Sequence, residues 1–280
     1  MMRNQFEGFY YKHQKNGRTL VVIAGRAKDH AFIQVATDGG AHIVRYPPLV
    51  YAAAGAMTRI DACTFSPGGI TLSIQRPELT MSGRIDYNGL TPLPGDIMGP
   101  FRFLPMQCRH TVVSLRHHLS GGVWIGGEYL DFTGGIGYIE GDSGRSFPRF
   151  YTWIHCGDLP KDSTVVAAVA DIPLAGLRFT GCIAVVRTAG KQYRLATYNG
   201  VKIVRCGERE IVLQQKKLRL MINVDSRPGH TLLAPVRGRM TREIRECIAC
   251  RARFRFYAGD VLLLDAFSER ASFERDGGGL

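Results

Sequence analysis

Residues 70–87 read ITLSIQRPELTMSGRIDY, and in this stretch apolar and polar side chains alternate almost without interruption. Because successive side chains of a β-strand point to opposite faces, such a period of two predicts half-buried strands. The same alternation returns in residues 248–256, IACRARFRF, where arginines alternate with apolar residues. Helical spacing is limited to Met240, Ile244 and Cys247–Ile248, where we expect at most a short helical turn. The pattern therefore predicts an all-β chain.

Turn residues support this prediction. Asp38-Gly39 and Asn199-Gly200 each separate two strand-like segments, and both dipeptides favour two-residue hairpin turns with positive φ. With the Asn199-Gly200 hairpin included, residues 181–223 are predicted to form a meander of four strands. The proline-rich residues 92–105 are expected to form a loop or a crossing segment.

The composition is that of an ordinary globular chain, with 280 residues, 45% hydrophobic residues and 33 glycines. This length suits two domains or one large all-β domain. Ser120-Gly121-Gly122 is the preferred boundary, which predicts an N-terminal β-domain over residues 1–120 and a C-terminal one over residues 121–280.

The chain carries a formal charge of +12, so its surface should attract anions. Two basic clusters stand out, and they comprise Arg251, Arg253 and Arg255, and Lys216, Lys217 and Arg219. The favoured interpretation is a solvated outer sheet face, and the functional variant is contact with an anionic membrane. Nucleic acid is not expected, because Phe254 and Phe256 should point away from the arginines.

Nothing before Phe6 resembles a signal peptide, and no apolar run is long enough to span a bilayer. The seven cysteines are an odd number, and we expect them to be reduced in a cytoplasmic protein, with a peripheral position at the membrane as the variant.

Metal and nucleotide motifs are missing from the sequence. Cys247 and Cys250 have CxxC spacing, but no second pair completes a zinc site, and on a strand their sulfurs should point to opposite faces. The adjacent His117 and His118 should diverge in the same way. Because no Walker, Rossmann or Gly-x-Ser-x-Gly motif occurs, we predict neither a metal nor a cofactor.

Chemistry is concentrated in residues 137–156. On an extended chain Tyr138, Glu140 and Asp142 point to one face, while Trp153 and His155 share a face of the next strand. If these strands are neighbours, an acid pair and an aromatic wall converge to form a proton-handling site. The alternative is a polar strand end, with Glu140 paired to Arg145 and the aromatic residues sealing a barrel.

Three segments resemble the tocopherol-cyclase-like family. Residues 6–14, FEGFYYKHQ, resemble its opening FEGWYFKHQ, and residues 137–148, GYIEGDSGRSFP, with 151–156 resemble its signature GYIExDWGRSFP…YxWIQCN. Residues 234–246 resemble its closing APVRGxM…IRE. The resemblance implies two antiparallel lipocalin-like β-domains, shared with carotenoid hydratases, and the founding members close a prenylated quinol to a chromanol.

The chain departs from the family pattern at three positions. Phe9 stands in place of a tryptophan, Ser143 in place of another, and His155 in place of a glutamine. Phe9 keeps an aromatic face, whereas Ser143 does not. The lost indole at position 143 motivates an alternative hypothesis, a non-catalytic carrier of a hydrophobic isoprenoid ligand.

Closing a chromanol ring requires protonation of an alkene, followed by capture of the tertiary cation by a phenol oxygen. Two neighbouring carboxyl groups can keep one proton near neutral pH, so Glu140 and Asp142 are the candidate acids. The expected aromatic and polar lining of the ligand site comprises Tyr138, Tyr151, Trp153, His155 and Phe9. The hypothesis is a tocopherol-cyclase-like enzyme acting on a hydrophobic small molecule, and a further alternative is an alkene hydratase, in which water captures the cation.

Overall fold

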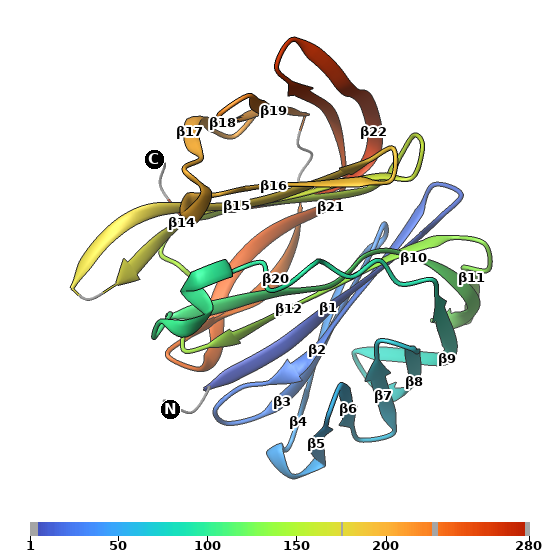
Figure 1. Ribbon diagram of the computed structural model, residues 1–280. Coiled ribbons are helices and arrows are strands. Elements are labelled where there is room, and N and C mark those ends of the chain that lie inside the picture. Colours follow the sequence, from blue (N-terminus) through green and yellow to red (C-terminus); the bar gives the residue numbers. More distant parts are fainter. Residues whose placement is uncertain (1–4, 175, 226–228, 278–280) are drawn as a thin grey trace. The chain divides into compact units, whose positions relative to one another are not determined.

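The computed structural model of the chain describes residues 5–174, 176–225 and 229–277. Within them the helical segments are three short 3₁₀ turns, namely η1 (Pro48–Val50), η2 (Gly99–Phe103) and η3 (Thr197–Asn199). The remaining regular structure is extended and forms two antiparallel sheets (Figure 1). The predicted fold class, all-β with two antiparallel lipocalin-like domains and little helix, is confirmed. No helix in these residues is long and apolar enough to cross a membrane.

The first sheet contains 12 strands in the order β4-β3-β2-β1-β12-β10-β9-β8-β7-β6-β5, with β11 paired to β10. Their bounds are β1 (Phe6–Lys15), β2 (Arg18–Arg26), β3 (Ala31–Thr37), β4 (Gly40–Tyr46), β5 (Tyr51–Ala54), β6 (Met57–Ile60), β7 (Cys63–Ser66), β8 (Gly69–Arg76), β9 (Leu79–Asn88), β10 (Cys108–Ile125), β11 (Glu128–Asp131) and β12 (Ile136–Gly144).

The second sheet contains 10 strands in the order β16-β15-β14-β13-β22-β21-β19-β18-β17, with β20 paired to β21. Their bounds are β13 (Tyr151–Leu159), β14 (Ser163–Leu174), β15 (Leu177–Thr188), β16 (Lys191–Ala196), β17 (Lys202–Cys206), β18 (Glu210–Gln215), β19 (Leu218–Asp225), β20 (His230–Val236), β21 (Arg239–Ala258) and β22 (Val261–Asp276).

Each sheet curls around its own apolar core. In the first core Val44 of β4 belongs to the same cluster as Ile60 of β6, so strands from both ends of the strand order meet around one interior. In the second core Leu195 of β16 clusters in the same way with Ile211 of β18. The alternation in residues 70–87 has the predicted effect, because Ile70, its alternating apolar neighbours and Ile85 are buried in the first core.

The chain divides into two compact units that differ from the predicted domains. One unit comprises Met1–Ile97, Cys108–Ser146 and Leu232–Arg242, and the other comprises Met98–Gln107, Phe147–Thr231 and Glu243–Leu280.

The expected boundary at residues 120–121 lies inside β10, where Gly121 pairs with Ile85 of β9. A Cβ atom on Gly121 would collide with the Arg84 carbonyl oxygen, and one on Gly122 would collide with that of Leu130. These glycines therefore allow β10 to pack closely against both neighbouring strands, and they do not form a linker.

One of the two predicted hairpins is correct. Asp38-Gly39 joins β3 to β4, although the positive φ falls on Gly40. Asn199-Gly200 does not join paired strands, because residues 197–199 form the 3₁₀ turn η3 and β16 and β17 stand at opposite ends of the strand order. The predicted four-stranded meander is therefore wrong at this connection. In place of β17, the Gln215 side chain accepts a hydrogen bond from the Ala196 N–H at 2.9 Å.

The expected helical turn near Met240 is also wrong, because residues 239–258 form the continuous strand β21. Apolar residues four apart suit one face of a strand as well as one face of a helix, and pairing with β22 decides between them. Cys247 and Cys250 were predicted to diverge, yet both lie in the second core, because the pairing of β21 with β22 shifts between them. The bulge there adds a residue and changes which side chains share a face.

The arginine face of β21 is solvated, as the favoured interpretation predicted. Arg251 pairs with Glu269 and Arg253 pairs with Asp265, each through two hydrogen bonds to an exposed carboxylate of β22. Phe254 is buried on the opposite face. Much of the positive charge of this face is therefore neutralised locally.

Candidate functional site

Strand β12 carries the predicted site residues through the middle of the first sheet, between β1 and β10. Ile139 points into the first core, so Tyr138, Glu140 and Asp142 share the opposite face of the sheet. On the face of a sheet that lies opposite its core, side chains are usually exposed to water. Here, however, Tyr138 is only 1% exposed and Glu140 only 6%. This second face of the sheet is therefore a buried polar surface.

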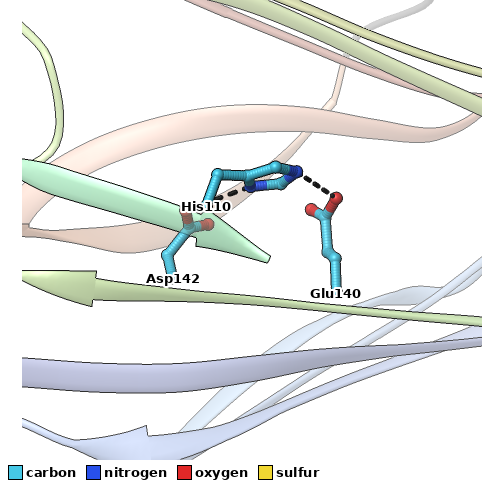
Figure 2. Close-up of side chains that lie close together, drawn as sticks. All are labelled: His110, Glu140 and Asp142. Atoms are coloured by element: carbon cyan, nitrogen blue, oxygen red, sulfur yellow. Dashed lines mark hydrogen bonds and ion pairs between the residues drawn. The ribbon is translucent and has the colours of Figure 1, made fainter. Parts of the chain in front are cut away.

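A histidine from the neighbouring strand joins the two acids. His110 of β10 is the register partner of Asp142. Its Nδ1 atom lies 3.1 Å from Oδ1 of Asp142, and its Nε2 atom lies 3.3 Å from Oε2 of Glu140. Figure 2 shows the imidazole ring lying between the two carboxylates, with one nitrogen toward each. His110 was not predicted from the sequence, because only the pairing of β10 with β12 brings it beside the two acids.

Two further groups extend this chain of contacts. The Tyr138 hydroxyl donates a hydrogen bond to Oε2 of Glu140 at 2.5 Å, so this oxygen faces both the phenol and the imidazole. At the other end the Cys108 thiol donates to Oδ1 of Asp142 at 3.6 Å. The acids, the histidine, the phenol and the thiol thus form a continuous polar row along β12 and β10.

The row runs from partly exposed to fully buried groups. The side chain of Asp142 is 25% exposed, that of His110 12% and that of Glu140 7%. Neither acidic side chain therefore points out into bulk water, which the hypothesis of an acid site required. In the alternative, Glu140 was paired with Arg145; in the structure Arg145 is exposed, and Glu140 contacts Tyr138 and His110.

Electrostatics place a proton on the imidazole. Burial by itself would lower the pKa of His110, but the carboxylates of Glu140 and Asp142 outweigh it and raise this pKa to about 9. His110 is therefore an imidazolium at neutral pH, held by two carboxylates. The pKa of Tyr138 is raised well above its usual value, first by burial and then by Glu140, so its hydroxyl stays protonated and keeps donating.

The same residues are the candidate ligands for a metal ion. His110, Glu140 and Asp142 each offer one ligand atom, and these atoms lie within 4.8 Å of one another. However, Nδ1 faces one carboxylate and Nε2 faces the other. The observed arrangement fits a protonated imidazole better than a metal centre.

Phe9 was predicted to line the same site as the acids, but the register puts it elsewhere. It is the partner of Gly141 and packs against the first core, so its ring lies on the other face of the sheet from Glu140. Ser143, an odd-numbered neighbour, also points away from the acid face. The loss of the family tryptophan at position 143 therefore leaves the face that carries Glu140 unchanged.

Two residues of β1 occupy the acid face and were not predicted. Tyr10 is the register partner of Glu140, and its ring lies 6.4 Å from that of Tyr138. Lys12 is the partner of Tyr138 and is 1% exposed. The alternation in residues 6–14 would have shown that Tyr10 and Lys12 share a face, but not that this face meets Glu140.

The remaining predicted residues lie in the second unit. Tyr151, Trp153 and His155 alternate along β13 and are buried on the face opposite its core. The Tyr151 hydroxyl donates to Glu274 of β22, and the Trp153 and His155 rings are stacked with centroids 6.4 Å apart.

Strands β12 and β13 belong to different sheets, so they are not neighbouring strands, and the condition set for the convergence of these residues is not met. Register also makes Glu246 of β21 the partner of Glu274, and both are buried.

Comparison with known proteins adds evidence about the fold. No protein-family model and no curated protein sequence matches the chain. A crystal structure from Nitrosomonas europaea, provisionally named AttH, is similar with a TM-score of 0.59 and 13% identity over 98% of this chain and 92% of that one.

Kievitone hydratase from Nectria haematococca is similar with a TM-score of 0.56 and 11% identity over 97% of this chain and 88% of that one. At these identities the similarity shows the two-domain all-β fold alone. The resemblance to the tocopherol-cyclase-like family remains a prediction.

Proposed function

We propose that the protein is an acid catalyst that adds an oxygen nucleophile to a carbon–carbon double bond of a hydrophobic isoprenoid substrate. The observation that carries this proposal is the position of the His110 imidazole between the carboxylates of Glu140 and Asp142 on a buried sheet face. A proton stored away from bulk water, beside the Tyr138 phenol, is what protonation of an alkene needs. The resemblance of residues 137–148 to the tocopherol-cyclase-like signature supports the choice of substrate.

The proposed reaction uses the cluster first as an acid and then as a base. A proton leaves the cluster, from the His110 imidazolium or through the Glu140 carboxyl group, and forms a C–H bond with one alkene carbon. The other carbon becomes a tertiary cation, and an oxygen nucleophile bonds to it. The proton released by that oxygen returns to the imidazole, so the cluster ends in its starting state. General acid catalysis of this kind contributes roughly 10²–10⁴-fold.

The nucleophile separates two forms of the proposal. If the substrate's own phenol oxygen attacks, the product is a chromanol, which corresponds to tocopherol-cyclase-like activity. If water attacks, the product is a tertiary alcohol. The fold similarity to a protein named kievitone hydratase favours testing hydration beside cyclisation.

The experiment incubates the purified protein with prenylated quinols of several chain lengths in heavy water. We expect a chromanol or a tertiary alcohol with one carbon-bound deuterium, because the alkene carbon takes its new hydrogen from the cluster. Glu140→Gln and His110→Gln should reduce the rate by roughly 10²-fold or more. The matched controls are Asp131→Asn and His118→Gln, whose side chains are exposed, and they should keep the rate of the unmodified protein.

The carrier hypothesis makes the opposite prediction. If native mass spectrometry shows an isoprenoid lipid retained unchanged, and no substrate in the series acquires deuterium, the enzymatic proposal is wrong. Turnover that survives both Glu140→Gln and His110→Gln would also contradict it, since the proton would then come from another group.

A further inference from the structure

Two hairpin tips of the second unit are joined into one edge (Figure 1). The β18–β19 turn consists of Lys216 and Lys217, and the β21–β22 turn consists of Gly259 and Asp260. The Gly259 N–H donates to the Lys217 carbonyl oxygen at 2.7 Å. The adjoining strands β19 and β21 are also paired up to their ends. The two turns therefore present a single, fixed surface, which we call the paired tips.

Apolar side chains are exposed at this surface. Val261 is 60% exposed and Leu262 is 46% exposed. Register places Arg219, Tyr257 and Leu262 in one row across β19, β21 and β22, so an arginine lies on the same face as Leu262. Val261 is in the next row, with Ala258 and Leu218, and projects from the other face at the tip. Exposure of neighbouring large aliphatic side chains to water costs free energy, and an interaction partner that covers them would remove this cost.

The positive charges at the paired tips differ from those of the arginine face on β21. Arg251 and Arg253 are matched by Glu269 and Asp265. Across residues 5–174, 176–225 and 229–277, by contrast, Lys216, Lys217 and Arg219 have no carboxylate within the 4.0 Å of an ion pair. Asp260 is the acidic residue in the turns themselves. The paired tips thus combine exposed aliphatic side chains with an excess of unneutralised positive charge.

We propose that the paired tips dock on the surface of an anionic lipid bilayer. Lys216, Lys217 and Arg219 would lie among acidic headgroups, while Val261 and Leu262 insert at the level of the headgroups and upper acyl chains. The aliphatic residues favour lipid over nucleic acid, because single strands bind on exposed aromatic rings and Tyr257 is partly buried in the row. The proposal depends only on this surface, so it stands or falls independently of the proposed function.

The test is cosedimentation with vesicles of phosphatidylcholine, alone or mixed with phosphatidylglycerol. We expect the intact protein to bind the mixed vesicles, to bind the neutral ones much more weakly, and to dissociate as salt is added. The double variant Lys216→Gln/Lys217→Gln should lose about tenfold or more in partition coefficient, because each cation contributes several-fold. Val261→Ser/Leu262→Ser should lose about tenfold through the apolar part.

The matched control removes the same charge elsewhere. Arg45 and Arg59 are exposed in the first unit, and Arg45→Gln/Arg59→Gln should bind within about twofold of the unmodified protein if the tips make the contact. Thermal unfolding of every variant checks that the fold is retained. Equal losses in the control and the tip variants would overturn the proposal. The proposal would also be overturned if the intact protein did not bind the mixed vesicles. The same holds if the Lys216→Gln/Lys217→Gln variant changed the binding of DNA but not of vesicles.

Discussion

Oε2 of Glu140 lies 3.3 Å from Nε2 of His110, so a carboxylate and an imidazole from adjacent strands hold one buried pair of charges. The pairing of β12 with β10 creates this contact, and Asp142 completes it from the other side of the ring. The arrangement makes the protonation state of His110 depend on both acids, which is the property most open to direct measurement.

Removing one acid should lower the pKa of His110. Since the Glu140 carboxylate is the leading influence that raises this pKa to about 9, Glu140→Gln should move it down toward the ordinary value near 6.5. The measurement is an NMR titration of the His110 ring protons. Asp131→Asn, an exposed acid on β11, should leave the titration unchanged. A His110 pKa that stays near 9 in Glu140→Gln would show that the pair does not hold the proton.

Acid should destabilise the protein through two histidines inside the first unit. Burial lowers the pKa of His13 to about 4 and that of His117 to about 3, against 6.5 in an unfolded chain. Because these folded-state values are depressed, the stability they contribute is complete above pH 6.5 and is lost as the pH falls toward 4. Full protonation of His13 alone corresponds to about 3 kcal/mol. Urea unfolding at a series of pH values measures this loss.

At alkaline pH the stability of the protein should depend on pH in the opposite direction, because the pKa of His110 is raised. Its contribution is complete below pH 6.5 and is lost as the pH rises through about 9. His117→Gln should therefore flatten only the acid side of the stability profile, and His110→Gln only the alkaline side. If both variants change the same side, the assignment of these two pKa shifts is wrong.

A glycine of the central signature is required by the packing of Phe9. A Cβ atom at position 141 would lie 2.6 Å from Cδ1 of Phe9, so Gly141→Ala must push the ring out of the first core. We expect a loss of about 1–3 kcal/mol in the free energy of unfolding. Gly39→Ala is the control, because its Cβ would meet Thr37 Oγ1 at an ordinary 3.7 Å. Chemical unfolding of the two variants should rank Gly141→Ala as clearly less stable.

Gln34 should prove important for holding Leu232–Arg242, the last segment of the first unit, against β3. Its Nε2 donates to the Leu233 carbonyl oxygen at 3.0 Å, and its Oε1 accepts from the Leu233 N–H at 2.7 Å. Gln34→Leu leaves both backbone groups without these partners, which should cost about 1–3 kcal/mol. Limited proteolysis should then cut near residues 232–242 more readily. Gln75→Leu, at an exposed position, should not change the cleavage pattern.

The local sequence pattern was sufficient to predict a strand or turn where the residues of that segment alone determine its structure. Alternation identified the strands around Ile70 and Ile85, and Asp38-Gly39 identified a real hairpin. The local pattern gave a wrong prediction where the structure depends on pairing with a strand that is distant in the sequence. Asn199-Gly200 has hairpin chemistry, but β17 pairs with β18 and not with β16. The shift between Cys247 and Cys250 likewise depends on β22.

The candidate site shows the same division. The parity of Tyr138, Glu140 and Asp142 follows from strand geometry and was correct. The partner that gives these residues their chemistry, His110, becomes visible only when β10 is placed beside β12. Phe9 was assigned to the acid site by resemblance, whereas register turns it toward the core.

The two hydrogen bonds between Gln34 and Leu233 also have a consequence for synthesis on the ribosome. The first unit includes Leu232–Arg242, which emerges only after most of the second unit has been made. Nascent N-terminal domains generally fold before the rest of the chain. Here a growing chain that stops short of residue 232 exposes the Gln34 amide and the Phe32 ring, which Met240 later covers. Synthesis must therefore pass Arg242 before the first unit can reach its final form.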